Sequence, residues 1–269
     1  MTSIPTHEHW INTDPGRLYA KTWMPATDAG GSIPIILFHD SLGCVELWRD
    51  FPERLARTTG RQVVAYDRLG FGRSDRHPGH LDGRFVHDEA HGAFTALRNQ
   101  LKIGRFVAFG HSVGGGMAIG CAASFLEDCT GLITESAQAF VEDRTLQGIR
   151  AAQQSFAEPG QLERLQKYHG DKAAWVLSAW IDTWLAPSFA GWNLDEALGR
   201  IRCPNLVIHG EHDEFGSLLH PQRIADLTHG PAINRILKGC GHVPHREAPE
   251  TVLELIDSWL DASDDRMVS

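Results

Sequence analysis

The sequence predicts an α/β protein in which helices cover a mostly parallel, doubly wound sheet and a helical cap is inserted. Short apolar runs with strand-like composition recur along the chain, and each is followed by a longer segment whose apolar residues have helical spacing. This alternation is typical of parallel strands joined by crossover helices. It stops between Glu135 and Arg202, where three helical patterns follow one another without a strand.

The expected strands and helices can be placed from these runs. Two runs, around residues 9–12 and 18–23, flank the turn signal Asp14-Pro15-Gly16 and predict a hairpin. The predicted parallel strands are residues 35–38, 63–66, 106–109, 132–134, 206–208 and 233–237. Helical spacing, enough to cover both faces of the sheet, is found over residues 47–58, 86–101, 113–126 and 249–260.

The interruption predicts a helical cap over residues 139–198, inserted into a core made of residues 1–138 and 199–269. Its helical patterns cover residues 144–156, 162–168 and 173–185. Any single tryptophan of the cap can simply pack the cap onto the core, but several together predict an apolar channel for substrate. These tryptophans are Trp175, Trp180, Trp184 and Trp192.

Composition excludes several classes of function. The 269 residues are 42% hydrophobic and 22% charged, so a large core forms without disulfides or metal. A net charge of -9 and the lack of a basic run argue against nucleic acid as a partner. The longest apolar stretches, such as residues 33–38, are far shorter than the roughly 20 residues that span a bilayer.

We expect a cytoplasmic protein. The segment Met1 to Trp10 carries His7, Glu8 and His9 where a secretory signal has an apolar core. The five cysteines are odd in number and widely spaced, which fits reduced thiols better than a disulfide framework.

A nucleophile motif follows the run 106–109. Gly110-His111-Ser112-Val113-Gly114 has the pattern G-x-S-x-G and leads directly into a helical pattern. A sharp turn between strand and helix holds the serine clear of the sheet, and the flanking glycines let neighbouring backbone approach. The helix that begins at Val113 points N–H groups toward the oxyanion formed in acyl transfer. Ser112 is therefore the candidate nucleophile.

A serine hydroxyl needs a base, and the base needs an acid that orients it. Asp213 comes just after the run 206–208, and His242 just after the run 233–237. Both lie past the carboxyl end of a predicted strand, where open α/β sheets gather their sites. We therefore expect Asp213 as the acid and His242 as the base.

Other residues compete for these roles. Glu214 adjoins Asp213, and Glu135 follows the run 132–134, so either is an alternative acid. His245 is an alternative base, but His242 holds the last position of Gly239-Cys240-Gly241-His242.

Four blocks of the chain resemble the α/β-hydrolase superfamily, across nearly the whole length. They are the loop 39–43, similar to the family's His-Gly oxyanion loop, the glycine-rich turn 66–74, the elbow 110–114 and the histidine block 239–249. The resemblance implies the α/β-hydrolase fold and a serine-nucleophile member of the esterase or lactonase kind, with no cofactor and no metal. By position it implies the same Ser, Asp and His roles, in the chain order this fold uses.

The resemblance also implies the oxyanion donors, which are the N–H of Val113 and that of Ser41, with Leu42 as a second candidate for the first-loop donor. The family more often has glycine where this chain has Asp40. A carboxylate beside an oxyanion hole opposes the charge that forms there, unless it turns away or is paired. Asp40 can instead cap its loop or meet an arginine, and the sequence leaves these alternatives open.

Metal and nucleotide binding are not expected. His209 and His212 lack a third ligand at the spacing that zinc sites use, and the turn 66–74 lacks the third glycine of a dinucleotide fingerprint. The residues predict a serine hydrolase that cleaves a small or medium, largely apolar carboxylic ester.

Several alternatives remain open for the activity. A lactonase, a carbon–carbon bond hydrolase and a cofactor-free perhydrolase would use the same three residues. A protein of another class, a non-catalytic module, would bind a hydrophobic ligand without turnover. In each case the expected partner is a small molecule, and the expected assembly is a monomer or homodimer.

Overall fold

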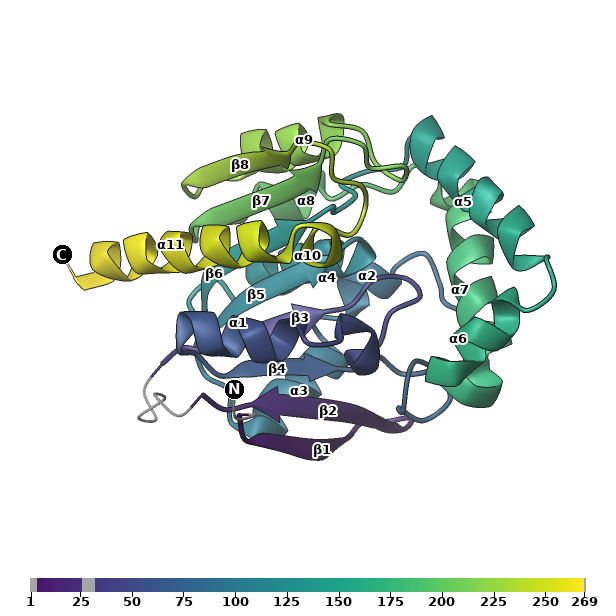
Figure 1. The fold of residues 1–269 in the computed structure, drawn as a ribbon, viewed down its shortest axis with the longest axis horizontal. Helices are drawn as coiled ribbons and strands as arrows, with labels where there is room; N and C mark the ends of the chain where they lie inside the picture. Colours follow the sequence, from purple (N-terminus) through teal and green to yellow (C-terminus); the bar gives the residue numbers. More distant parts are fainter. Residues whose placement is uncertain (1–3, 26–31, 269) are drawn as a thin grey trace.

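An eight-stranded sheet forms the centre of the part of the chain that the computed structural model describes, residues 4–25 and 32–268 (Figure 1). The strands lie in the order β1-β2-β4-β3-β5-β6-β7-β8. Their bounds are β1 Thr6–Asn12, β2 Arg17–Trp23, β3 Ile35–Phe38, β4 Val63–Tyr66, β5 Phe106–His111, β6 Cys129–Glu135, β7 Asn205–Gly210 and β8 Ala232–Leu237. The first three residues of the segment Met1 to Trp10, used above against a secretory signal, lie outside the described residues.

The sheet is antiparallel at one edge and parallel elsewhere. β1 and β2 form the predicted hairpin, with Asn12 opposite Arg17, and β2 pairs antiparallel with β4. From β4 to β8 every neighbouring pair is parallel. β3, β4, β5 and β7 are buried along their whole length, because helices cover both faces of the sheet. The predicted fold class is confirmed.

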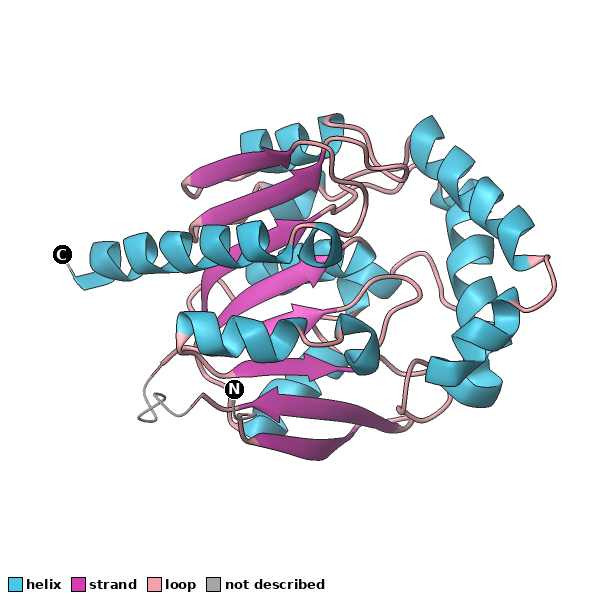
Figure 2. Cartoon of the chain, in the orientation of Figure 1, coloured by secondary structure: helices cyan, strands magenta, loops and turns pink. Residues whose placement is uncertain are grey.

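Helices pack on both faces of the sheet (Figure 2). α1 (Phe51–Thr59) and α11 (Pro249–Val268) cover one face, where Leu55 and Ile256 are fully buried. The core on the other face contains residues of α2 to α4, α8 and α9. The bounds of these and of the remaining short helices are α2 Phe85–Asp88, α3 Ala93–Leu101, α4 Val113–Ser124, α8 Asp195–Leu198, α9 Leu219–Leu227, α10 Pro244–Glu247, η1 Val45–Trp48, η2 Gly170–Lys172 and η3 Pro187–Phe189.

Three further helices stand apart, at the end of the sheet where the parallel strands finish (Figure 2). They are α5 (Asp143–Phe156), α6 (Gln161–His169) and α7 (Ala173–Leu185), and both α5 and α6 pack on α7. Buried His169 ties this group to the core, since its ring lies 2.9 Å from the amide nitrogen of Gly72 and 3.0 Å from the carbonyl oxygen of Leu42. At the end of the predicted cap, α8 packs on α4 and α9 of the core. The boundaries at 139 and 198 stay a prediction.

Two predicted helices are broken in the structure. Residues 47–58 divide into η1 and α1, and α1 begins just before Pro52, because proline lacks an N–H and fits only the first turn of a helix. Residues 86–101 divide into α2 and α3 at Gly92, whose φ of -101° and ψ of -100° are not helical. The last helix runs past its predicted end at 260, to Val268.

Within residues 4–25 and 32–268, no helix is both long and apolar enough to cross a membrane. The five cysteines are free thiols, and four of them are buried.

Candidate active site

Ser112 stands on a strained turn between β5 and α4. Its φ of 56° and ψ of -127° lie in a region that side-chain-bearing residues rarely adopt. Gly114 permits this turn, because a Cβ there would come within 2.2 Å of the carbonyl oxygen of Phe38 on β3. The amide of Ser112 donates to the carbonyl of Glu135 at 2.8 Å, which fixes the turn against β6.

The structure brings Ser112, His242 and Asp213 into one hydrogen-bonded row. Nε2 of His242 lies 3.0 Å from Oγ of Ser112, and Nδ1 lies 2.8 and 2.9 Å from the two carboxylate oxygens of Asp213. Because Nδ1 faces a carboxylate it carries the proton, so Nε2 has a free lone pair toward the serine hydroxyl. The imidazole is therefore in the tautomer that accepts a proton from Ser112.

Asp213 is held by the loop that follows β7. Its Oδ1 accepts hydrogen bonds from the amides of Phe215 at 2.8 Å and Gly216 at 3.1 Å. Burial alone would raise the pKa of Asp213, but the hydrogen bond and charge of His242 hold this pKa below its usual value. The carboxylate therefore stays ionised beside the imidazole at neutral pH.

The same pairing acts on His242. Burial alone would lower its pKa, but the hydrogen bond and the negative charge of Asp213 raise it, and the charges of Glu214 and Asp40 add to that effect. The net pKa of His242 lies above the usual histidine value. A base of this kind is stronger than free imidazole.

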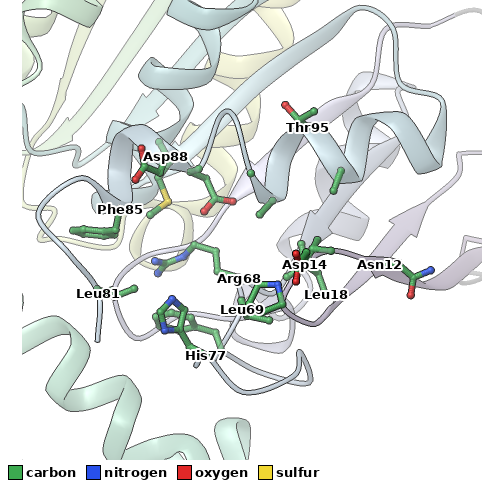
Figure 3. A pocket seen from close by; sticks show the side chains of 18 of the residues that line it. Asn12, Asp14, Leu18, Arg68, Leu69, His77, Leu81, Phe85, Asp88 and Thr95 are labelled. Atoms are coloured by element: carbon green, nitrogen blue, oxygen red, sulfur yellow. The ribbon is translucent and has the colours of Figure 1, made fainter. Parts of the chain in front are cut away.

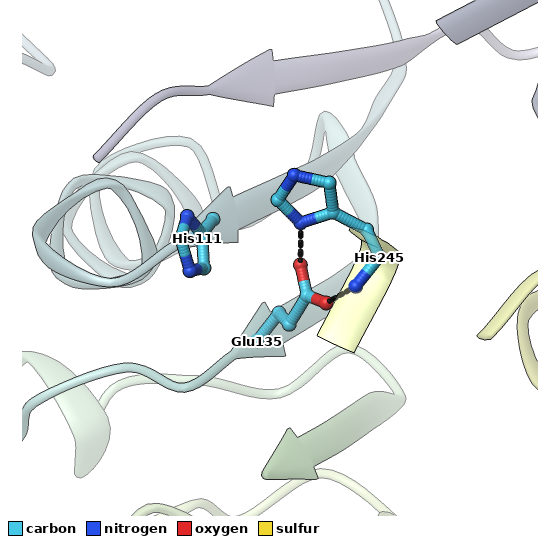
Figure 4. A group of neighbouring side chains, drawn as sticks. All are labelled: His111, Glu135 and His245. Carbon is cyan, nitrogen blue, oxygen red and sulfur yellow. Dashed lines mark hydrogen bonds and ion pairs between the residues drawn. The ribbon is translucent and has the colours of Figure 1, made fainter. Parts of the chain in front are cut away.

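The two alternative acids occupy other places. Glu214 lines the pocket in front of Ser112 and reaches His242 only through its charge. Glu135, at the end of β6, is fully buried and holds His245: one oxygen accepts from the backbone amide, and the other lies 2.7 Å from Nδ1 (Figure 4). The structure thus contains a second imidazole–carboxylate pair close to the first.

The ring of His111 lies near the imidazoles of both pairs, with ring centres 5.1 Å from that of His242 and 5.0 Å from that of His245. Together with Glu135 and His245, His111 forms a group of possible metal ligands (Figure 4). The ligand atoms of the three residues lie within 4.8 Å of one another. However, both oxygens of Glu135 already accept from His245, and Nε2 of His111 lies 2.8 Å from the carbonyl oxygen of His242. His111 thus supports the backbone of His242, while Glu135 holds His245. His209 is buried beneath Asp213 whereas His212 is exposed, so those two rings do not share a site.

A pocket of about 180 Å³ opens in front of Ser112 and His242. Trp180 and Trp184 of α7 line it, together with Thr145 and Ile149 of α5 and Phe215 of the Asp213 loop. Its walls are mainly apolar, which suits an uncharged group bound next to the serine.

The other two tryptophans of the predicted channel lie elsewhere, and this corrects the expectation for them. Trp175 stacks on His77 with ring centres 5.1 Å apart, and its Nε1 donates to the carbonyl of Gly79 at 2.8 Å. Trp192 packs on Trp184 and Phe189. Both are packing residues, because a tryptophan gains as much from burying its ring against other helices as from lining a pocket.

Sequence reasoning missed Gln138, whose Oε1 lies 3.3 Å from Oγ of Ser112. Its place three residues past the end of β6, the strand next to β5, is the signal that could have found it. Thr145, Ile149 and Phe215 gave no such signal, since their place depends on how α5 docks over the sheet.

The predicted oxyanion donors border the same space. Ser41 and Leu42 line the pocket with Ser112, and Ser41 and Val113 both border a small gap beside it. The carbonyl of Leu42 accepts from His169 of α6, so this loop is braced by the helices above it.

Asp40 also faces this pocket. Its carboxylate lies over Gly43, where a Cβ would come within 2.0 Å of Oδ1. Burial would raise the pKa of Asp40, but the nearby charges of His111, His39, Arg246 and His242 outweigh burial and lower it. The carboxylate is thus ionised close to the candidate oxyanion site, and it is the backbone carbonyl of Asp40, not the carboxylate, that meets an arginine, Arg68, at 2.9 Å.

The strained serine turn, the imidazole–carboxylate pair and the doubly wound sheet together define a hydrolase of the α/β class. The chain belongs to the alpha/beta hydrolase family, whose model matches residues 35–255.

Proteins that are similar to this chain in sequence are named for different activities. A proline iminopeptidase of Lactobacillus delbrueckii subsp. bulgaricus is 23% identical, over 91% of this chain and 95% of its own. The sn-1-specific diacylglycerol lipase ABHD11 of Danio rerio is 32% identical, but the match covers only 35% of this chain and 28% of that protein.

Among solved structures, a thermophilic esterase from Thermogutta terrifontis has a TM-score of 0.72 at 21% identity, over 96% of this chain and 99% of its own. An enol-lactonase from Burkholderia xenovorans LB400 has a TM-score of 0.71 at 18% identity, over 94% and 100%. Likeness at this level of identity shows the fold.

Proposed function

We propose that this protein is a serine hydrolase that cleaves a small or medium, largely apolar carboxylic ester through an acyl-enzyme. The observation that carries the proposal is the unbroken row from the Ser112 hydroxyl through His242 to the Asp213 carboxylate. Such a row converts a weak nucleophile into a reactive one, because the base removes the hydroxyl proton as the carbonyl is attacked.

The steps follow from the geometry. Oγ of Ser112 attacks the ester carbonyl while Nε2 of His242 takes the hydroxyl proton, and the protonated ring then donates to the leaving alkoxide. Water next gives a proton to His242 and attacks the acyl-enzyme, and the ring returns this proton to Oγ of Ser112 as the carboxylic acid leaves. Asp213 stabilises the imidazolium in both halves of the reaction. The N–H groups of Val113 and of Ser41 or Leu42 are the proposed donors to the oxyanion.

The pocket supports a modest acyl group. A space of about 180 Å³ is smaller than the 300 Å³ or more that is typical of sites for drug-sized ligands. Ile149, Trp180 and Trp184 offer apolar contact to an alkyl or small aromatic group. We therefore expect the rate to fall once the acyl chain exceeds a medium length.

The test is intact-mass analysis after treatment with a fluorophosphonate, followed by a series of p-nitrophenyl esters of rising chain length. The expected result is one adduct, lost in Ser112→Ala together with hydrolysis. Ser124→Ala, at the other end of α4, is the matched control and should label like the wild type. If the folded wild-type protein takes no adduct and cleaves no ester, the site binds without turnover, as the binding-module alternative requires.

A further inference from the structure

A second cavity, of about 770 Å³, lies between the β1–β2 hairpin, the turn 66–74 and helices α2 and α3. Figure 3 shows Arg68 in the middle of its lining, with Leu81 and Phe85 to one side and Asn12 and Asp14 to the other. The outer part is lined by exposed polar residues, whereas Arg68 itself is only 5% exposed.

Arg68 is a buried cation that the described protein leaves largely unpaired. Its Nη2 donates to the carbonyl of Asp40 at 2.9 Å and lies 3.5 Å from Nδ1 of His39, and the guanidinium lies 4.1 Å from the centre of the Phe71 ring. Its Nε has no hydrogen-bond partner, and the guanidinium forms no ion pair with any described residue. Buried guanidinium groups are normally paired with a carboxylate, because desolvation of an unpaired charge is unfavourable.

The acids around Arg68 do not supply that partner. Glu89 acts on Arg68 through its charge but forms no ion pair with it, and its Oε1 accepts from the hydroxyl of Tyr66 at 2.5 Å. The carboxylate of Asp40 likewise acts on Arg68 only through its charge, and it lies over Gly43. An anion from outside the protein would complete the coordination of the guanidinium.

Arg68 also stands next to the candidate active site. A gap of about 10 Å³, roughly the volume of one water position, lies between the two larger spaces and shares lining residues with each. It shares Ser41, Trp180 and Trp184 with the Ser112 pocket. With the large cavity it shares Arg68, Phe71, Leu81 and Phe85.

We propose that Arg68 binds the carboxylate of an acidic substrate whose ester carbonyl lies at Ser112. This inference rests on the proposed function and deepens it, because it makes the substrate an ester of a dicarboxylic acid. The apolar pocket then holds the chain between the two carbonyl carbons. Leu81 and Phe85, both half-buried, have to rotate to widen the gap for a carboxylate. Guanidinium is suited to the task, since its planar fork matches the two oxygens of a carboxylate.

The experiment compares p-nitrophenyl hemiesters of succinate, glutarate and adipate with neutral p-nitrophenyl alkanoates of equal chain length. In the wild type, kcat/KM for the best hemiester should exceed that for its neutral partner by about tenfold or more. In Arg68→Met this ratio should drop to about one or below. The ratio is the readout because a purely structural effect of the variant lowers both rates alike.

Arg73→Met is the matched control, since Arg73 lies on the same turn but pairs with Glu8 at the surface, and it should keep the wild-type ratio. Arg68→Lys, which keeps the charge without the Nε donor, should lower the ratio about threefold and replaces Arg68→Met if that variant does not fold. A wild type that prefers the neutral esters, or a ratio unchanged in the Arg68 variants, would overturn the inference.

Binding to Ser112→Ala separates this inference from the proposed function. Calorimetry should show glutarate bound at one site, with binding lost when Arg68→Met is added. If glutarate binds in this way while the wild type takes no fluorophosphonate and cleaves no ester, the proposed function is wrong and the Arg68 site stands. If esters are cleaved but glutarate does not bind, or inorganic phosphate alone binds, the carboxylate site is wrong and the hydrolase stands.

Discussion

Two buried imidazole–carboxylate pairs lie side by side in this protein, and only one of them touches a nucleophile. His242 meets Asp213 past the end of β7, and His245 meets Glu135 at the end of the neighbouring strand β6. In both pairs Nδ1 faces the carboxylate at 2.7 to 2.9 Å. The difference lies at the other ring nitrogen.

Nε2 of His242 faces Ser112 and the pocket, whereas Nε2 of His245 is buried without a hydrogen-bond partner among the described residues. The ring of His245 packs instead against Trp48 and Phe51, with ring centres 4.7 and 5.3 Å away. The same imidazole–carboxylate arrangement can therefore either activate a nucleophile or stabilise the packed interior. The role of each pair depends on whether Nε2 of its histidine contacts a nucleophile that borders an accessible pocket.

The largest expected difference between the pairs is in catalysis. Asp213→Asn should lower kcat for p-nitrophenyl ester hydrolysis by about 10⁴, because an amide does not hold the imidazole in the reactive tautomer. The corresponding change in the other pair, Glu135→Gln, should leave kcat of the folded enzyme within about tenfold. Steady-state kinetics on variants shown to be folded by circular dichroism give kcat for both. Equal losses in the two variants would mean that the pair at Glu135 takes part in the chemistry.

The second expected difference is in stability. Glu135→Gln leaves His245 without its charged partner in a dry site, and such a change costs about 3 to 5 kcal/mol in the free energy of unfolding. Asp213→Asn should cost less, because the ring of its partner His242 borders the pocket instead of lying in a closed apolar site. Urea unfolding at pH 7 measures both.

The stability loss in Glu135→Gln should also depend on pH. Burial would raise the pKa of Glu135, but His245 lowers it below the usual value of 4.5, so the ionised form stabilises the folded state above that pH. As the pH falls through the pKa of the folded state this contribution is lost, and the gap between wild type and variant should close. A gap that is constant down to pH 3 would contradict an ion-pair origin.

The contrast between the pairs also explains what the sequence could reveal. Ser112, Asp213 and His242 were predictable because a turn motif and two strand ends fix their places, and parallel strands bring their carboxyl ends to one edge. Glu135 was rightly singled out as an acid at a strand end. The histidine that pairs with Glu135 could not be predicted, because the path of the loop after β8 decides whether His242 or His245 contacts it.

The pocket was harder to predict than the row of three residues. Whether a tryptophan of α7 points into the pocket depends on how the helix docks: Trp180 and Trp184 line the pocket, while Trp175 stacks on His77. Arg68 lies within the turn 66–74, and its burial without an ion pair cannot be told from the sequence.

A smaller effect should appear in the pH profile. Because Asp213, Glu214 and Asp40 together raise the pKa of His242 above its usual value near 6.5, kcat should fall on the acid side with a midpoint above that value. The protonated ring can no longer accept the proton of Ser112. Initial rates from pH 5 to 9 measure the midpoint, with chemistry shown to be rate-limiting by a burst-free time course. If kcat does not change between pH 5 and 9, His242 is not the base.

The smallest expected effect concerns Asp40, which acts on the first pair from the oxyanion loop. Its negative charge helps to raise the pKa of His242, so Asp40→Asn should move the acid limb of the kcat profile to lower pH. The same change removes a negative charge beside the developing oxyanion, so kcat at pH 8 should rise severalfold. His212→Gln, an exposed histidine on the Asp213 loop, is the control for loop disturbance. A different outcome is also informative, in which the acid limb shifts to lower pH in Asp40→Asn while kcat at pH 8 falls instead of rising. The carboxylate of Asp40 would then raise the pKa of His242 and also hold the loop that carries Ser41 in place, through its position opposite Gly43.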